Sequence, residues 1–125
     1  MKKILIDTDV LINFLRENHA VKEYLESIVN DSVIYCSTIT VAKIYAGMRE
    51  SERKKTINLI DSLNIADVTR NISEKAGIYK RDEKKQILEL DDCIIAATAF
   101  EKGAALVTCN GKHYPMQDIK KEILR

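Results

Sequence analysis

Two kinds of apolar segment alternate along the chain: short runs rich in β-branched residues, and longer segments with helical spacing. The short runs predict strands at residues 4–6, 32–36 and 105–108, with a weaker one at 65–68. The longer segments repeat apolar residues every three or four positions and predict helices at 10–15, 21–29, 40–48, 57–63, 71–87 and 92–100. Residues 119–124 fit either an edge strand or a helix. The alternation predicts an α/β fold with a doubly wound parallel sheet.

Polar residues interrupt this pattern where predicted strands end or helices begin. Asp7 follows the first strand, Asn110 follows the strand at 105–108, and Asp91 and Asp92 open the most apolar helix. In open α/β sheets, ligands bind at the carboxyl edge where such positions meet, so we expect a site there. Asp9 is expected to cap the first helix. One carboxylate at a helix start is usually only a cap, whereas several at one edge suit Mg²⁺ or Mn²⁺.

Length and composition narrow the class of protein. A chain of 125 residues suffices for a single domain, residues 1–125, with one core. The net charge of +1 does not by itself indicate a polyanion partner, so a nucleic-acid surface would need local clustering of basic residues. No apolar run suits a membrane span or a signal peptide, and three unpaired cysteines argue against a disulfide framework. We therefore expect a cytoplasmic protein.

Four segments, in order, resemble the motifs of the PIN domain family and, within it, the VapC-like toxins of type II toxin-antitoxin pairs. The segments are 4–13, 40–47, 92–99 and 107–114. The resemblance covers nearly the whole chain. It implies a three-layer sandwich with a central parallel sheet and the activity of a metal-dependent endoribonuclease. It further implies an RNA substrate, a homodimer and inhibition by a cognate antitoxin.

The resemblance also assigns roles to individual residues. Asp7 and Asp92 match the family's acidic metal ligands, which would hold Mg²⁺ or Mn²⁺ to activate water for attack on an RNA phosphodiester. Thr8 matches a small hydroxyl residue beside the first ligand. Asn110 stands where members carry Asp or Asn and would position a water. Asp9 is either a supporting group or only a cap, and Asp91 is expected to point elsewhere on its helix than Asp92.

Lys43 departs from the family pattern, because the second motif normally carries Glu at this position. One unit charge about 4 Å from a cation is worth up to roughly 4 kcal/mol near a protein surface, so the exchange bears directly on metal affinity. Lys43 could pair with Asp7 and Asp92 in place of the metal and leave the nuclease inactive. It could instead swing out on its flexible stem, or be a change made to silence a toxin. A solvated helix face is a further possibility.

Two other functions compete with a ribonuclease. The first is a catalytically degenerate PIN domain that only binds RNA or an antitoxin, with Lys43 bonded to Asp7 or Asp92. The second resembles a haloacid dehalogenase phosphatase, in which Asp7 and Asp9 supply the nucleophile and acid and Lys43 clamps phosphate. The phosphatase hypothesis leaves the segment 92–99 unexplained. RNA cleavage without phosphomonoester hydrolysis would eliminate it.

Two surfaces are expected to bind macromolecules. Phosphates that flank the cleaved bond would contact some of a group of basic residues. Its members are Arg49, Arg53, Lys54, Lys80, Arg81, Lys84 and Lys112. The antitoxin would contact a groove between the amphipathic helices of residues 48–63, although Tyr45, Met48 and Ile57 fit a core role equally well.

Overall fold

The computed structural model describes all residues, Met1–Arg125, and contains one five-stranded parallel sheet. The strands are β1 (Lys2–Ile6), β2 (Ser32–Ser37), β3 (Asn64–Ala66), β4 (Ala105–Thr108) and β5 (Lys121–Ile123). The helices are α1 (Thr8–Leu15), α2 (His19–Ile28), α3 (Thr38–Gly47), α4 (Arg53–Asp61), α5 (Arg70–Asp82) and α6 (Leu90–Lys102). Short 3-10 turns lie at Glu50–Glu52 and Gly111–His113. The predicted α/β fold is confirmed.

The central strand β1 pairs with β2 on one side and β4 on the other, in the sheet order β3-β2-β1-β4-β5. Successive residues of β1 face opposite sides of the sheet, as strand geometry requires. Leu5 belongs to one apolar core and Ile4 and Ile6 to the other, and all three are fully buried. Two covered faces explain why this strand is a continuous apolar run.

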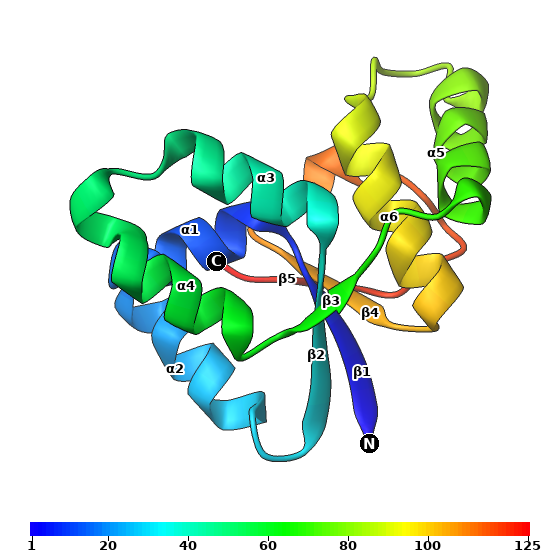
Figure 1. Ribbon diagram of the computed structural model, residues 1–125. Coiled ribbons are helices and arrows are strands. Elements are labelled where there is room, and N and C mark those ends of the chain that lie inside the picture. The colour runs from blue at the N-terminus through cyan, green and yellow to red at the C-terminus, as the bar shows by residue number, and fades with distance from the viewer.

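Helices cover both faces of the sheet (Figure 1). The core that contains Leu5 is closed by α5 and α6, whereas the core that contains Ile4 and Ile6 is closed by α1, α2 and part of α3. Helix α3 contacts α1, α4 and α6. This arrangement gives the three-layer sandwich and brings the starts of α1, α3 and α6 to one edge of the sheet.

The start of α1 corrects one prediction, since Asp7 and not Asp9 is the N-cap. The Asp7 backbone is extended, and its Oδ1 accepts a hydrogen bond from the Thr8 N–H at 2.7 Å. Asp9 lies inside the first turn of the helix. Similarly, α3 begins two residues before the predicted Thr40, because the Ser37 side chain accepts a hydrogen bond from the Ile39 N–H and caps the helix there.

The structure corrects the predicted end of one helix and decides the structure of the C-terminal segment. Helix α5 ends at Asp82, well before the predicted residue 87. The Glu83 backbone is extended and ends the helix, and beyond it Leu88 packs into the core while Ile87 is 90% exposed. The undecided tail forms β5, a parallel edge strand beside β4. No helix is both long enough and apolar enough to span a membrane.

Candidate active site

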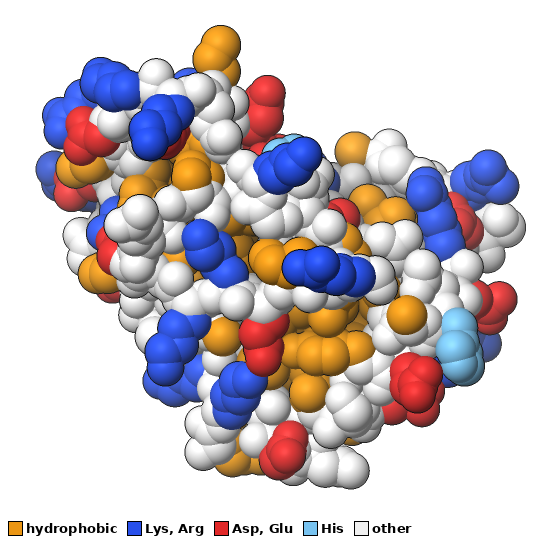
Figure 2. Space-filling model, turned by 180° about the vertical axis from the view of Figure 1, so that it is seen from behind, with side chains coloured by type: hydrophobic (Ala, Val, Ile, Leu, Met, Phe, Trp, Pro, Cys, Tyr) orange, Lys and Arg blue, Asp and Glu red, His pale blue; other side chains and the backbone are white.

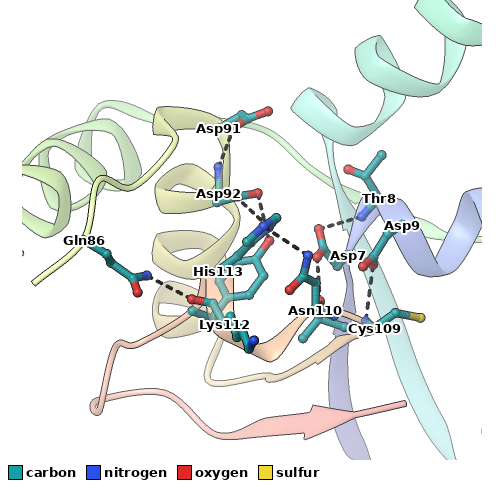
Figure 3. Close-up of polar contacts among 12 residues, drawn as sticks. Asp7, Thr8, Asp9, Gln86, Asp91, Asp92, Cys109, Asn110, Lys112 and His113 are labelled. Atoms are coloured by element: carbon teal, nitrogen blue, oxygen red, sulfur yellow. Dashed lines mark hydrogen bonds and ion pairs between the residues drawn. The ribbon is translucent and has the colours of Figure 1, made fainter. Parts of the chain in front are cut away.

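Asp7 and Asp92 reach the same edge of the sheet from different elements (Figure 3). Asp7 follows the last residue of β1, and Asp92 lies in the first turn of α6. The two residues are only 5% and 8% exposed. The structure therefore brings together the two acids that the sequence singled out as metal ligands.

Hydrogen bonds fix the orientation of the Asp7 carboxylate. Besides the bond from Thr8, its Oδ2 accepts one from the Thr108 hydroxyl at 2.8 Å. Thr108 is the last residue of β4 and is fully buried. Thr8, the expected hydroxyl neighbour of Asp7, shares a hydrogen bond of 2.9 Å between its Oγ1 and that of Thr40 on α3. The ends of β1 and β4 and the first turns of α1 and α3 are thus tied together around Asp7.

Asp92 contacts two residues that the sequence reasoning did not assign to the site. Its Oδ1 accepts a hydrogen bond from the buried Tyr114 hydroxyl at 3.3 Å, and its Oδ2 lies 3.3 Å from His113 Nδ1. Burial and the charges of Asp91 and Asp7 raise the pKa of Asp92, against the opposing effects of His113 and Tyr114. Both neighbours lie in the fourth motif, where their aromatic and imidazole side chains were the only signal.

Asn110 lies at the exposed mouth of the site. Its side-chain Nδ2 is 3.0 Å from His113 Nε2, and its backbone N–H donates to the Thr108 hydroxyl at 3.0 Å. Asn110 is therefore linked through His113 to Asp92, and through Thr108 to Asp7 (Figure 3). This places it beside both acids.

Asp9 also faces the site, although it is not the helix cap. Its Oδ1 accepts a long hydrogen bond from the Cys109 N–H at 3.5 Å. Burial and the nearby charge of Asp7 raise the pKa of Asp9 to about 6. Asp9 thus lies beside Asp7, held between α1 and the chain after β4.

Lys43 forms an ion pair with Asp91, and none with Asp7 or Asp92. The pair joins α3 to α6, and its side chains are 41% and 30% exposed. The contact raises the pKa of Lys43, and it lowers the pKa of Asp91 although burial alone would raise it. Lys43 does not pair directly with Asp7 or Asp92, because the neighbouring carboxylate Asp91 binds its ammonium and leaves those two acids without an ion pair to Lys43.

The orientation of Asp91 explains this pairing. Asp91 points away from Asp7 and Asp92, as expected, and it faces α3 (Figure 3). Its Oδ1 also accepts a hydrogen bond from the Asp92 N–H at 2.9 Å, which satisfies one free donor of the first turn of α6. Asp91 therefore supports the start of α6 and holds Lys43 at the same time.

The donor set of the acidic pair fits a divalent cation. Asp7 and Asp92 offer carboxylate oxygens, which Mg²⁺ and Mn²⁺ prefer, and a cation would offset the burial and the repulsion by Asp91 and Asp7 that raise the pKa of Asp92. No group of three or more His, Cys, Asp or Glu side chains converges closely enough to hold a metal ion. Mg²⁺ commonly keeps several waters in protein sites, so one or two carboxylates are an ordinary protein contribution.

Several of the basic residues predicted to contact RNA already bind other groups of the chain. Arg53 pairs with Glu50 at 3.8 Å and Arg81 with Asp82 at 2.9 Å, while Lys80 donates to the Leu88 carbonyl. Figure 2 shows Lys and Arg side chains interleaved with acidic and apolar ones over the face that it presents.

Two pockets lie along the helices where the partner groove was predicted. One, of about 90 Å³, lies between α1, α3 and α4 and includes Lys43, Met48 and Thr56 in its lining. The other, of about 200 Å³, is mainly apolar, and its lining includes Phe14, Leu25, Leu59 and Leu63. Helix α4 therefore lines both pockets, the first through Thr56 and the second through Leu59.

Comparisons with known proteins agree with this architecture. Ribonuclease VapC10 of Mycobacterium tuberculosis is 35% identical over 117 residues, which cover 90% of this chain and 86% of that protein. The structure of VapBC2 from Rickettsia felis bound to a promoter DNA fragment has a TM-score of 0.86 at 21% identity, and the match covers 98% of this chain and 99% of that one. A toxin-antitoxin complex from Klebsiella pneumoniae has a TM-score of 0.80 at 25% identity, and covers 93% and 94% of the two chains.

The sequence also matches the PIN domain family over residues 4–119. That match includes Asp7, Lys43, Asp92 and Asn110, so it spans every residue of the site predicted from sequence. Together with the identity to VapC10, it establishes that this chain belongs to the PIN domain family.

Proposed function

We propose that the chain is an endoribonuclease that hydrolyses RNA phosphodiester bonds at the Asp7 and Asp92 edge, and that it is the toxin of a toxin-antitoxin pair. The observation that carries the proposal is the buried pair of carboxylates at the carboxyl edge of a PIN domain sheet. The name of its relative, ribonuclease VapC10, supports the same reaction. The haloacid dehalogenase hypothesis loses its basis, because the chain belongs to a different family.

Asp7 and Asp92 would hold Mg²⁺ or Mn²⁺. When bound, such a cation lowers the pKa of a coordinated water and offsets charge that develops on the phosphate. The chain's own residues prepare the two ligands: Thr108 orients Asp7, and Tyr114 orients Asp92. Burial of both carboxylates excludes bulk water and keeps them in fixed positions.

Asn110 and His113 would contact the RNA or a water on the exposed side of the two acids. Both are exposed and can donate or accept hydrogen bonds where an RNA strand or a water approaches the site. The contact between His113 and Asp92 keeps the imidazole beside the reacting edge. We assign Asn110 the placement of a water or a phosphate oxygen.

The proposed partners are RNA, a cognate antitoxin and a second copy of the chain. The antitoxin is supported by the Klebsiella pneumoniae complex, a toxin bound to its antitoxin. The mainly apolar pocket lined by Phe14, Leu25, Leu59 and Leu63 offers a surface for apolar side chains of such a partner. A homodimer rests on the family resemblance, and size-exclusion chromatography with light scattering tests it.

Cleavage of a labelled single-stranded RNA with Mg²⁺ or Mn²⁺ tests the reaction. We expect cleavage by the wild type, loss of cleavage in Asp92→Asn, and unchanged cleavage in Asp67→Asn, an exposed residue outside the site. Asp92→Asn is the cleaner variant, because Asp7 also caps α1. An intact wild-type protein that cleaves no RNA with either metal would refute the proposal.

A second candidate is a PIN domain that binds RNA or antitoxin without cleaving RNA. Its expected bond from Lys43 to Asp7 or Asp92 is absent, because Lys43 pairs with Asp91, but the charges of both acids still act on the Lys43 ammonium. The comparison of wild type with Lys43→Glu separates the two functions. Cleavage by the wild type shows that Lys43 does not block the site. Cleavage only by Lys43→Glu would show that the natural chain is a binding module, and calorimetry with Mn²⁺ would then find metal binding restored in that variant.

A further inference from the structure

Lys43 places a positive charge at the entrance to a strongly acidic site. Four carboxylates lie at this edge, those of Asp7, Asp9, Asp91 and Asp92. Among the Lys and Arg side chains, Lys43 alone forms an ion pair with one of these four. An RNA phosphate that approaches the two buried acids must therefore enter a region of negative potential, at which Lys43 supplies a positive charge paired with one of the four acids.

The geometry leaves the Lys43 ammonium available to a ligand. An ammonium has three N–H donors, and Asp91 takes one of them. The Lys43 side chain remains 41% exposed, so its other donors can reach solvent. The Asp91 carboxylate itself accepts a hydrogen bond from the Asp92 N–H. The position of the Lys43 ammonium is therefore restricted by its ion pair with Asp91.

The position of Lys43 connects the acidic site to the neighbouring hollow. Its side chain lines the pocket between α1, α3 and α4, together with Arg16. Asp92 and Asp7 are both close enough to Lys43 to raise its pKa. The ammonium thus stands between the acidic edge and a hollow that the side chains of Arg16 and Glu52 also line.

We infer that Lys43 is an RNA-binding residue of this site, which donates to a backbone phosphate next to the acidic pair while Asp91 holds it in place. The inference rests on the proposed ribonuclease function and specifies how this chain admits a polyanion to an acidic site. A phosphate is favoured over a neutral ligand because it accepts charge-assisted hydrogen bonds, which are about twice as strong as neutral ones.

Binding of a short labelled single-stranded RNA, measured by fluorescence anisotropy in EDTA over about 50 to 200 mM salt, tests the inference. Removal of metal ions prevents metal-dependent cleavage and leaves only the side chains to contact phosphate. We expect Lys43→Gln to weaken binding and to reduce the slope of log K against log salt by about 0.7, the value for one contact to single-stranded nucleic acid. Lys43→Arg should retain the slope.

Lys22→Gln is the matched control, since Lys22 is an exposed lysine on α2 that forms no ion pair. It should bind RNA like the wild type. Thermal unfolding of each variant shows whether it folds. A folded Lys43→Gln with the wild-type affinity and salt slope would overturn the inference, even if the wild type cleaves RNA. A wild type that neither binds nor cleaves RNA would instead refute the proposed function and this inference with it.

Discussion

The Tyr114 hydroxyl donates a hydrogen bond of 3.3 Å to Asp92 Oδ1 and joins the end of the fourth motif to the start of α6. Tyr114 is fully buried, and burial together with the charges of Asp7 and Asp92 raises the pKa of its hydroxyl. The hydroxyl therefore keeps its proton and remains a donor across the physiological range. It is the buried donor to Asp92, whose other side-chain contact is the exposed His113.

Removal of this hydroxyl by Tyr114→Phe should lower the free energy of unfolding by about 1–2 kcal/mol, because a buried carboxylate loses a donor. Urea denaturation in EDTA measures the change. Tyr45→Phe is the control, since Tyr45 is 38% exposed and its hydroxyl forms no hydrogen bond. Equal stability of Tyr114→Phe and wild type would show that the 3.3 Å contact contributes nothing.

The fold could be predicted from sequence because its determinants are local. The buried run of β1 and the helical spacing of α6 each fix one element, and the alternation of such elements fixes the parallel sheet. The start of a helix was harder to predict where two nearby residues could both act as its N-cap. Asp7 and Asp9 are both good caps, and only the extended backbone of Asp7 in the folded chain decides between them.

The sequence alone could not show which side chains the site residues contact. Asp91 and Asp92 are adjacent, and which of them meets Lys43 depends on the rotation of α6 relative to α3. That rotation is set by packing and not by motif spacing. The contact of His113 with Asp92 depends in the same way on the path of the chain after β4.

The raised pKa of Asp9, about 6 against an ordinary value of 3.8, predicts that ionised Asp9 lowers the free energy of unfolding to a degree that depends on pH. The folded state binds the proton more tightly than the unfolded state, so stability falls as pH rises from 3.8 to about 6. Asp9→Asn removes this cost. In EDTA at pH 7 it should raise the free energy of unfolding by about 1–2 kcal/mol, a figure reduced for partial exposure of the side chain.

Urea denaturation of Asp9→Asn and wild type over the acid range checks this sign. The advantage of Asp9→Asn should shrink below pH 6 and vanish below 3.8, where wild-type Asp9 is protonated in both states. Asp67→Asn, at an exposed position, should show no such trend. A stability difference that does not change with pH would contradict the assignment.

Glu122 anchors the edge strand β5, for which the sequence offered two structures. It accepts hydrogen bonds of 2.9 Å from Lys2 on β1 and from the Tyr24 hydroxyl on α2, and these contacts lower its pKa below 4.5. Its side chain is 38% exposed, so Glu122→Gln should cost only about 1 kcal/mol at pH 7.

A lowered pKa gives stability that is present above 4.5 and lost as pH falls through the folded-state value. The difference in the free energy of unfolding between wild type and Glu122→Gln should therefore become smaller at acid pH. Hydrogen exchange at β5 amides should be faster in Glu122→Gln at pH 7, and Glu101→Gln, an exposed residue without an ion pair, should leave it unchanged. Unaltered exchange in Glu122→Gln would show that β5 is held by backbone pairing alone.

Thr108 connects the fold to the proposed chemistry through two hydrogen bonds of its buried hydroxyl. Its hydroxyl donates to Asp7 Oδ2 and accepts from the Asn110 N–H, so Thr108→Val removes both contacts while preserving shape. We expect a loss of about 2–3 kcal/mol in the free energy of unfolding, because a buried carboxylate and a backbone donor lose a partner at once. RNA cleavage should fall further than the fraction of unfolded protein accounts for.

Thr98→Val is the matched control for this prediction. Thr98 is also fully buried, but its hydroxyl only donates to the Ile94 carbonyl within α6, so its loss should cost about 1 kcal/mol or less and leave cleavage intact. Urea denaturation and RNA cleavage are measured on both variants. If Thr108→Val cleaves RNA as Thr98→Val does, then Asp7 reaches its working orientation without Thr108, and the bond from Thr8 suffices to place it.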